Sequence, residues 1–184
     1  MHFLRNAFLE AGHPSGRGPV TQLDPCSTAI RIIGLGNGLR GDDAVGLLAA
    51  RRLQGLVSDR AEVVEAESAG VELLELMEGA SVVLFIDAVR SRQVPGTIHR
   101  LDASAGPIAP ELFPPSTHAI GVGEALELAR TLGILPAKVI VYGIEADDTS
   151  IGHPLSPEVG QALHEVVELV LREIESQACT NSIS

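Results

Sequence analysis

The strongest constraint on the fold is an alternation of short aliphatic runs with segments of helical periodicity. The runs at 29–35, 81–86 and 138–144 are dominated by Ile, Val and Leu. Continuous apolar runs of this length are typical of strands in a parallel sheet that is covered on both faces. Hydrophobic residues make up 45% of the chain but aromatic residues only 3%, so the core must be mainly aliphatic.

The order of these segments predicts the fold class. Strands are expected at 29–36, 61–65, 81–86, 97–101 and 138–144. A first helix is expected to begin at about residue 43, and three more are expected at 70–79, 118–133 and 157–176. This order specifies an open, mainly parallel, twisted sheet of about five strands with helices on both faces, which is a three-layer α/β/α sandwich. Such sheets carry their sites at the carboxyl ends of strands, near the point where the strand order reverses.

Length and charge limit the domain organisation and the partners. We expect one α/β domain at 29–176, a flexible N-terminal extension at 1–28 and a C-terminal tail at 177–184. The net charge of −11 argues against a nucleic acid or an anionic membrane as partner. No stretch approaches the ~20 apolar residues of a membrane span, and no clear secretory cleavage site follows the N-terminus, so we expect a cytoplasmic protein.

A glycine-rich turn, 34–38, follows the first strand and partly matches a nucleotide-binding fingerprint. That fingerprint needs a third glycine three residues after the second, where this chain has Leu39. Asp42 and Asp43 also lie where a helix N-terminus would otherwise bind phosphate. The segment therefore argues against a nucleotide cofactor.

Three polar residues at strand–helix connections form the candidate site. Asp43 follows the first strand by a short loop, Asp87 ends the third strand, and His118 begins a helix. Two carboxylates and one imidazole match a divalent-metal site with oxygen and nitrogen ligands.

Each of the three also has a simpler explanation. From its segment alone, Asp43 is better explained as a helix cap or a first-turn charge. Asp87 could open a turn, and His118 could be a polar cap. Asp87 carries the best physical argument for function, because a charge directly after a buried strand is costly without a partner or a cation.

Several segments form an ordered pattern over roughly residues 30–175. They are GLGNGLRGDDAVG at 34–46, SAG at 68–70, IDAV at 86–89, PGT at 95–97, STH at 116–118 and YGI at 142–144. The pattern resembles the hydrogenase maturation endopeptidase family. The resemblance implies a phosphorylase/hydrolase-like α/β/α fold and an endopeptidase that removes the C-terminal extension of a nickel–iron hydrogenase large-subunit precursor after nickel insertion.

The resemblance also implies roles for individual residues. The metal-contacting residues of the family correspond by position to Asp43, Asp87 and His118, which would form the catalytic site and contact nickel held in the substrate. Gly36 and Asn37 would shape the turn that presents Asp43. The family often has Glu at the first of the three positions, and Asp43 is one methylene shorter.

One departure concerns the choice of substrate. The family has a stretch similar to Asp-Gly-Gly-Thr where this chain reads EAES at 65–68. Glu67 and Ser68 are therefore the candidates for substrate selection, and the hydrogenase that is served stays open. The alternative function is a chaperone that binds the large subunit as a nickel checkpoint without cutting it.

Overall fold

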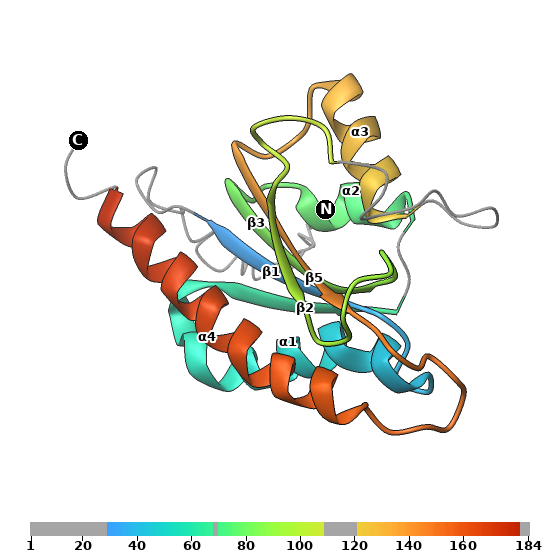
Figure 1. The fold of residues 1–184 in the computed structure, drawn as a ribbon. Coiled ribbons are helices and arrows are strands. Elements are labelled where there is room, and N and C mark those ends of the chain that lie inside the picture. Colours follow the sequence, from blue (N-terminus) through green and yellow to red (C-terminus); the bar gives the residue numbers. More distant parts are fainter. Residues whose placement is uncertain (1–28, 68–69, 109–120, 181–184) are drawn as a thin grey trace, which may run out of the picture.

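The computed structural model describes residues 29–67, 70–108 and 121–180 (Figure 1). Along these residues the elements are β1 (Ile30–Leu35), α1 (Val45–Val57), β2 (Glu62–Ala66), α2 (Glu72–Met77), β3 (Val82–Val89), β4 (Ile98–Asp102), α3 (Val122–Leu132), β5 (Lys138–Glu145) and α4 (Pro157–Thr180). Short 3₁₀ turns precede and follow α1, at Gly41–Ala44 and Ser58–Arg60.

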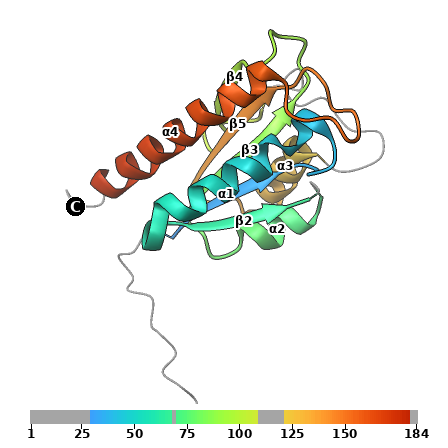
Figure 2. The ribbon, with the colours of Figure 1, turned by 90° about the horizontal axis from the view of Figure 1, so that it is seen from below.

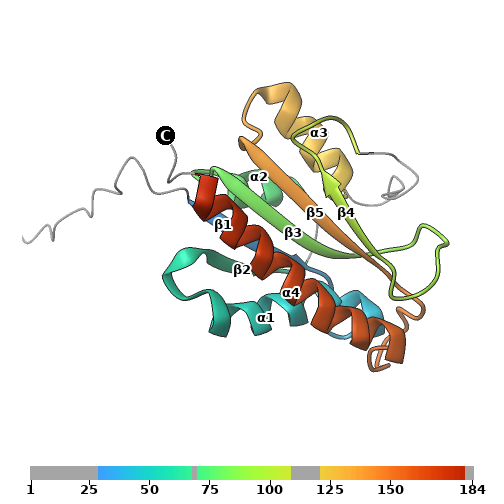
Figure 3. The same ribbon diagram turned by 60° about the vertical axis from the view of Figure 1, so that its left-hand side comes forward.

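The strands form one sheet in the order β2-β1-β3-β5-β4. Every neighbouring pair is parallel except β4 and β5, and β4 lies at the edge beside β5 (Figure 3). The strand order reverses between β1 and β3, because the chain passes from β1 to β2 on one side and then to β3 on the other. The predicted mainly parallel sheet is confirmed.

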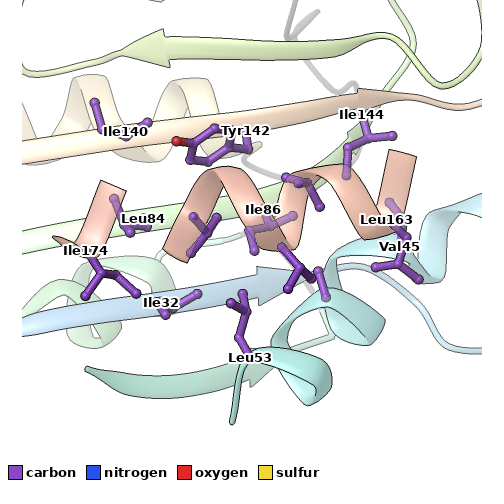
Figure 4. Packing of buried hydrophobic residues seen from close by; sticks show 14 of the residues in the cluster. Ile32, Val45, Leu53, Leu84, Ile86, Ile140, Tyr142, Ile144, Leu163 and Ile174 are labelled. Carbon is purple, nitrogen blue, oxygen red and sulfur yellow. The ribbon is translucent and has the colours of Figure 1, made fainter. Parts of the chain in front are cut away.

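Helices cover both faces of the sheet. Figures 1 and 2 show α1 and α4 on one face and α2 and α3 on the other. Successive residues of a strand point to opposite faces, so each inner strand contributes to both cores. The core under α1 and α4 is shown in Figure 4 and includes Ile32, Val45, Leu53, Leu84, Ile86, Ile140 and Leu163. The core under α2 and α3 includes Ile33, Leu73, Phe85, Leu126 and Val141.

Most elements lie within about two residues of their predicted bounds, and two continue further than predicted. β3 continues beyond Asp87 to Val89, because β5 is equally long and pairs with Ala88 and Val89. Asp87 therefore lies within the strand and does not follow it. α4 continues beyond Ser176 to Thr180, since no Gly or Pro stops the helix there. The predicted start of α3 at His118 lies outside the described residues.

Helix α1 packs against the sheet through glycine. A Cβ atom at Gly46 would lie 2.2 Å from the carbonyl oxygen of Leu35 and 2.3 Å from that of Ile86. A Cβ atom at Gly34 would lie 2.2 Å from the carbonyl oxygen of Gly46. The first turn of α1 thus lies directly on the carboxyl ends of β1 and β3, backbone against backbone.

Gly46→Ala is expected to lower the free energy of unfolding by about 3 kcal/mol, because the added methyl group meets two fixed carbonyl groups. The matched control is Gly55→Ala in the same helix, where nothing lies within 4 Å of the added Cβ. That substitution should stabilise the protein by about 0.5–1 kcal/mol through helix propensity. Urea denaturation measures both changes, and a similar loss in the two variants would contradict this account of the helix–sheet contact.

Candidate active site

Asp43 and Asp87 meet at the edge of the sheet where the strand order reverses. Asp43 lies in the 3₁₀ turn Gly41–Ala44 between β1 and α1, and Asp87 lies near the carboxyl end of β3. Asp87 alternates with Val83 and Phe85, which pack under α2 and α3, so its side chain points to that face. One carboxylate thus comes from the turn after β1 and the other from β3, the two strands that flank the switch point.

The environment of Asp87 disfavours a negative charge. Burial, and after it the negative charge of Asp43, raise the pKa of Asp87 from 3.8 to about 7, against a smaller opposing effect of a hydrogen bond from the backbone N–H of Ala88. Desolvation combined with a like charge is the pattern that recurs at functional sites. Near neutral pH this edge of the sheet is therefore favourable for a cation.

The backbone of Asp43 is fixed by Gly36 and Asn37. Gly36 has φ +137°, and a Cβ atom there would lie 1.8 Å from the carbonyl oxygen of Asp43. The same oxygen accepts a hydrogen bond from the backbone N–H of Asn37 at 3.2 Å. The side chain of Asn37 in turn accepts a hydrogen bond from the N–H of Leu39 at 2.9 Å. The turn thus folds back on itself and holds Asp43 above β1.

The neighbouring Asp42 has a different role, which the sequence did not reveal. Its carboxylate is fully buried and accepts hydrogen bonds from the backbone N–H groups of Asp147 and Asp148, both at 2.9 Å. It also accepts bonds from the N–H of Ser156 at 2.7 Å and from its hydroxyl at 3.0 Å. Neither aspartate caps a helix through a side-chain hydrogen bond, although both lie in the first turn of the 3₁₀ helix Gly41–Ala44, as the alternative of a first-turn charge expected. Asp42 instead ties the β5–α4 loop to the turn that carries Asp43.

The structure places some of the other predicted residues. Glu67 is exposed and directly follows Ala66, the last residue of β2. The carbonyl oxygen of Ala66 accepts a hydrogen bond from the N–H of Gly36 at 3.2 Å. Glu67 therefore lies next to the turn that carries Asp43. His118 and Ser68 lie outside the described residues. Within 29–67, 70–108 and 121–180, no three His, Cys, Asp or Glu side chains are grouped so as to hold a metal ion.

The described helices include none that is long and apolar enough to cross a membrane.

Comparison with known proteins decides the family. The family model for hydrogenase maturation proteases, HycI, matches residues 48–173. The chain belongs to this family. Hydrogenase 2 maturation protease of Escherichia coli is 29% identical over 147 residues, which is 77% of this chain and 88% of that protein. The HupD hydrogenase expression/formation protein of Thiocapsa roseopersicina is also 29% identical over 147 residues, which is 77% of this chain and 66% of that protein.

Solved structures agree with this assignment. The hydrogenase maturating endopeptidase HybD from E. coli has a TM-score of 0.70 and 27% identity, covering 81% of this chain and 93% of HybD. The HycI protease from Thermococcus kodakarensis, at 21% identity, shares the fold with a TM-score of 0.65, over 80% of this chain and 93% of that one. This hydrogenase maturation protease is therefore a peptidase with the predicted α/β fold, and nothing in these matches favours a non-cleaving chaperone.

Asp42→Ala is expected to lower the free energy of unfolding by about 3 kcal/mol or more, because the N–H groups of Asp147, Asp148 and Ser156 lose a buried, charged acceptor. Asp43→Ala is the matched control. Its carboxylate accepts no hydrogen bond from the described part of the chain, so its loss should change stability by less than about 1 kcal/mol. Thermal and urea unfolding measure both, and equal losses would contradict the distinct roles of the two aspartates.

Asp87→Asn is expected to stabilise the metal-free protein at alkaline pH. The carboxyl titrates at 3.8 in the unfolded chain and at about 7 in the folded one, so the folded state binds the proton more tightly. The free energy of unfolding then falls as pH rises from about 4 to about 7. Replacing the charge should leave stability unchanged near pH 4 and raise it by roughly 2–4 kcal/mol at pH 8.

The measurement for Asp87→Asn is urea denaturation of wild type and variant across this pH range. Asp59→Asn, an exposed aspartate in the 3₁₀ turn after α1, is the control and should show no such trend. A stability difference that does not vary with pH would contradict the raised pKa.

Proposed function

We propose that this protease removes the C-terminal extension of a nickel–iron hydrogenase large-subunit precursor after nickel has been inserted. The observation that carries the proposal is the pair Asp43 and Asp87, which lie close together at the switch point of the sheet. The chain that forms this sheet belongs to the hydrogenase maturation protease family. Two like charges held close together favour a dication, and an ion brought in by the substrate would supply it.

The substrate's nickel would be contacted by Asp43, Asp87 and His118. Carboxylate oxygen and imidazole nitrogen are both suitable ligands for such an ion. A metal ion next to a peptide bond can polarise the carbonyl group or activate water. Gly36 and Asn37 would keep Asp43 in position for this contact. The proposal is supported by the close approach of Gly36 to the carbonyl oxygen of Asp43 and by the hydrogen bond that this oxygen accepts from the N–H of Asn37.

Selection of the substrate would involve the carboxyl end of β2, the strand next to β1. Glu67 is exposed beside the turn of Asp43, so its carboxylate is available to a protein bound at this edge. Ser68 stays a prediction of the sequence, as does the cytoplasmic location of the protein.

The test is incubation of the protein with nickel-loaded precursor, followed by measurement of product mass. Wild-type protein should shorten the precursor, and nickel-free precursor should stay intact. Asp87→Ala and His118→Ala are each expected to slow processing by about 100-fold or more, as for loss of a group that acts in the transition state. Circular dichroism should show that both variants remain folded.

The matched control is Asp59→Ala, which removes an exposed aspartate in the 3₁₀ turn after α1 and should process at the wild-type rate. A precursor that binds wild-type protein but keeps its full mass would exclude the peptidase. Full activity of both Asp87→Ala and His118→Ala would refute the site assignment while leaving the activity itself intact.

A further inference from the structure

Hydrophobic side chains are most exposed at one edge of the sheet. Among the described residues, the most exposed large hydrophobic side chains are Ile151 at 76%, Leu39 at 74% and Val94 at 72%. They lie in the connections that follow β5, β1 and β3. Because these strands are parallel, their carboxyl ends meet at the same edge. This is the edge that carries Asp43 and Asp87.

Leu39 and Ile151 belong to two loops that lie against each other. The N–H of Gly152 donates a hydrogen bond to the carbonyl oxygen of Leu39 at 2.8 Å, and the N–H of Asp42 donates one to that of Asp148 at 2.8 Å. Figures 1 and 3 show the loop after β5 beside the turn that precedes α1. The backbones of Leu39 and Ile151 are therefore adjacent, although the two residues are far apart in the sequence.

Hydrogen bonds within each loop hold this arrangement in place. The N–H of Leu39 donates to the side chain of Asn37 at 2.9 Å. In the other loop, the carboxylate of Asp148 accepts a hydrogen bond from the N–H of Ser150 at 2.8 Å and lies 2.5 Å from Nδ1 of His153. The two exposed side chains thus project from ordered backbone. A partner that covers them would have little loop motion to suppress, which favours binding.

The pair Leu39 and Ile151 adjoins the candidate active site. Asn37 connects Leu39 to Asp43, because its backbone N–H donates to the carbonyl oxygen of Asp43 while its side chain accepts from the N–H of Leu39. A protein that brings a metal ion to Asp43 therefore lies next to the pair. A second copy of this chain bound to the pair would crowd the same approach, so the substrate is the occupant that this position favours.

We propose that Leu39 and Ile151 form a docking contact for the large-subunit precursor and bind an apolar patch on its surface near the nickel. The inference rests on the proposed function. Aliphatic side chains that are exposed in the free protein gain free energy when a partner covers them, and the centres of protein interfaces are poor in charged residues. The contact involves no metal ion, so it contributes equally to the binding of nickel-loaded and nickel-free precursor.

The test compares the double variant Leu39→Ser/Ile151→Ser with the matched control Leu132→Ser/Ile134→Ser. The control residues are 57% and 53% exposed and lie at the end of α3 and before β5, at the opposite edge of the sheet. Surface plasmon resonance measures the Kd for both forms of the precursor. The first variant should raise both values about tenfold or more. Its KM for nickel-loaded precursor should rise with kcat nearly unchanged, as for loss of a contact made equally in the ground and transition states.

Thermal unfolding first checks that the variants fold, and the single variants Leu39→Ser and Ile151→Ser replace the double variant if it does not. Wild-type Kd values in the first variant, or an equal loss in the control, would overturn the docking contact. So would a changed sedimentation coefficient of the free protein with unchanged precursor binding, which would assign the pair to a second copy of this chain.

A different outcome would overturn the proposed function. Wild-type protein that binds nickel-loaded precursor without cutting it would exclude the peptidase, while the Kd values of the variants would still decide the docking contact. A loss of affinity confined to nickel-loaded precursor would contradict a contact that involves no metal ion.

Discussion

The close contact between the first turn of α1 and the carboxyl ends of β1 and β3 is the constraint on which the rest of the structure depends. Gly34 and Gly46 allow the helix backbone to lie against the strand backbone. The turn that joins β1 to α1 must then pass over the switch point, and it carries Asp43 to within electrostatic range of Asp87. A larger residue at either glycine would separate the two layers and the two carboxylates with them.

A second tie makes this arrangement rigid. Asp42 and Asp43 are adjacent in sequence, but the first is fully buried and bonded to the β5–α4 loop while the second lies at the candidate site. The buried carboxylate of Asp42 links the loop after β1 to the loop after β5. The backbone of these two loops is thereby held in place along one side of this edge of the sheet. The site is thus assembled from rigid strand ends and a loop pair that supports them.

The sequence was sufficient for the fold class because aliphatic runs and helical periodicity are local signals. That Asp87 lies near the carboxyl end of a strand was predictable for the same reason, but not that pairing with β5 continues the strand past it to Val89. The role of Asp42 was not predictable, because its partners lie 105 to 114 residues away. His118 entered through family resemblance alone, and the described residues do not include it.

The raised pKa of Asp87 has a thermodynamic consequence for binding at the site. Near neutral pH its carboxyl group is shared between protonated and ionised forms. A dication that arrives with a bound protein would displace that proton, so association would be linked to proton release. A precursor without its metal would leave the proton on Asp87, and its binding would gain no free energy from the two carboxylates. On the proposed function, the protein would then distinguish nickel-loaded from nickel-free precursor by the exchange of a proton for a metal ion.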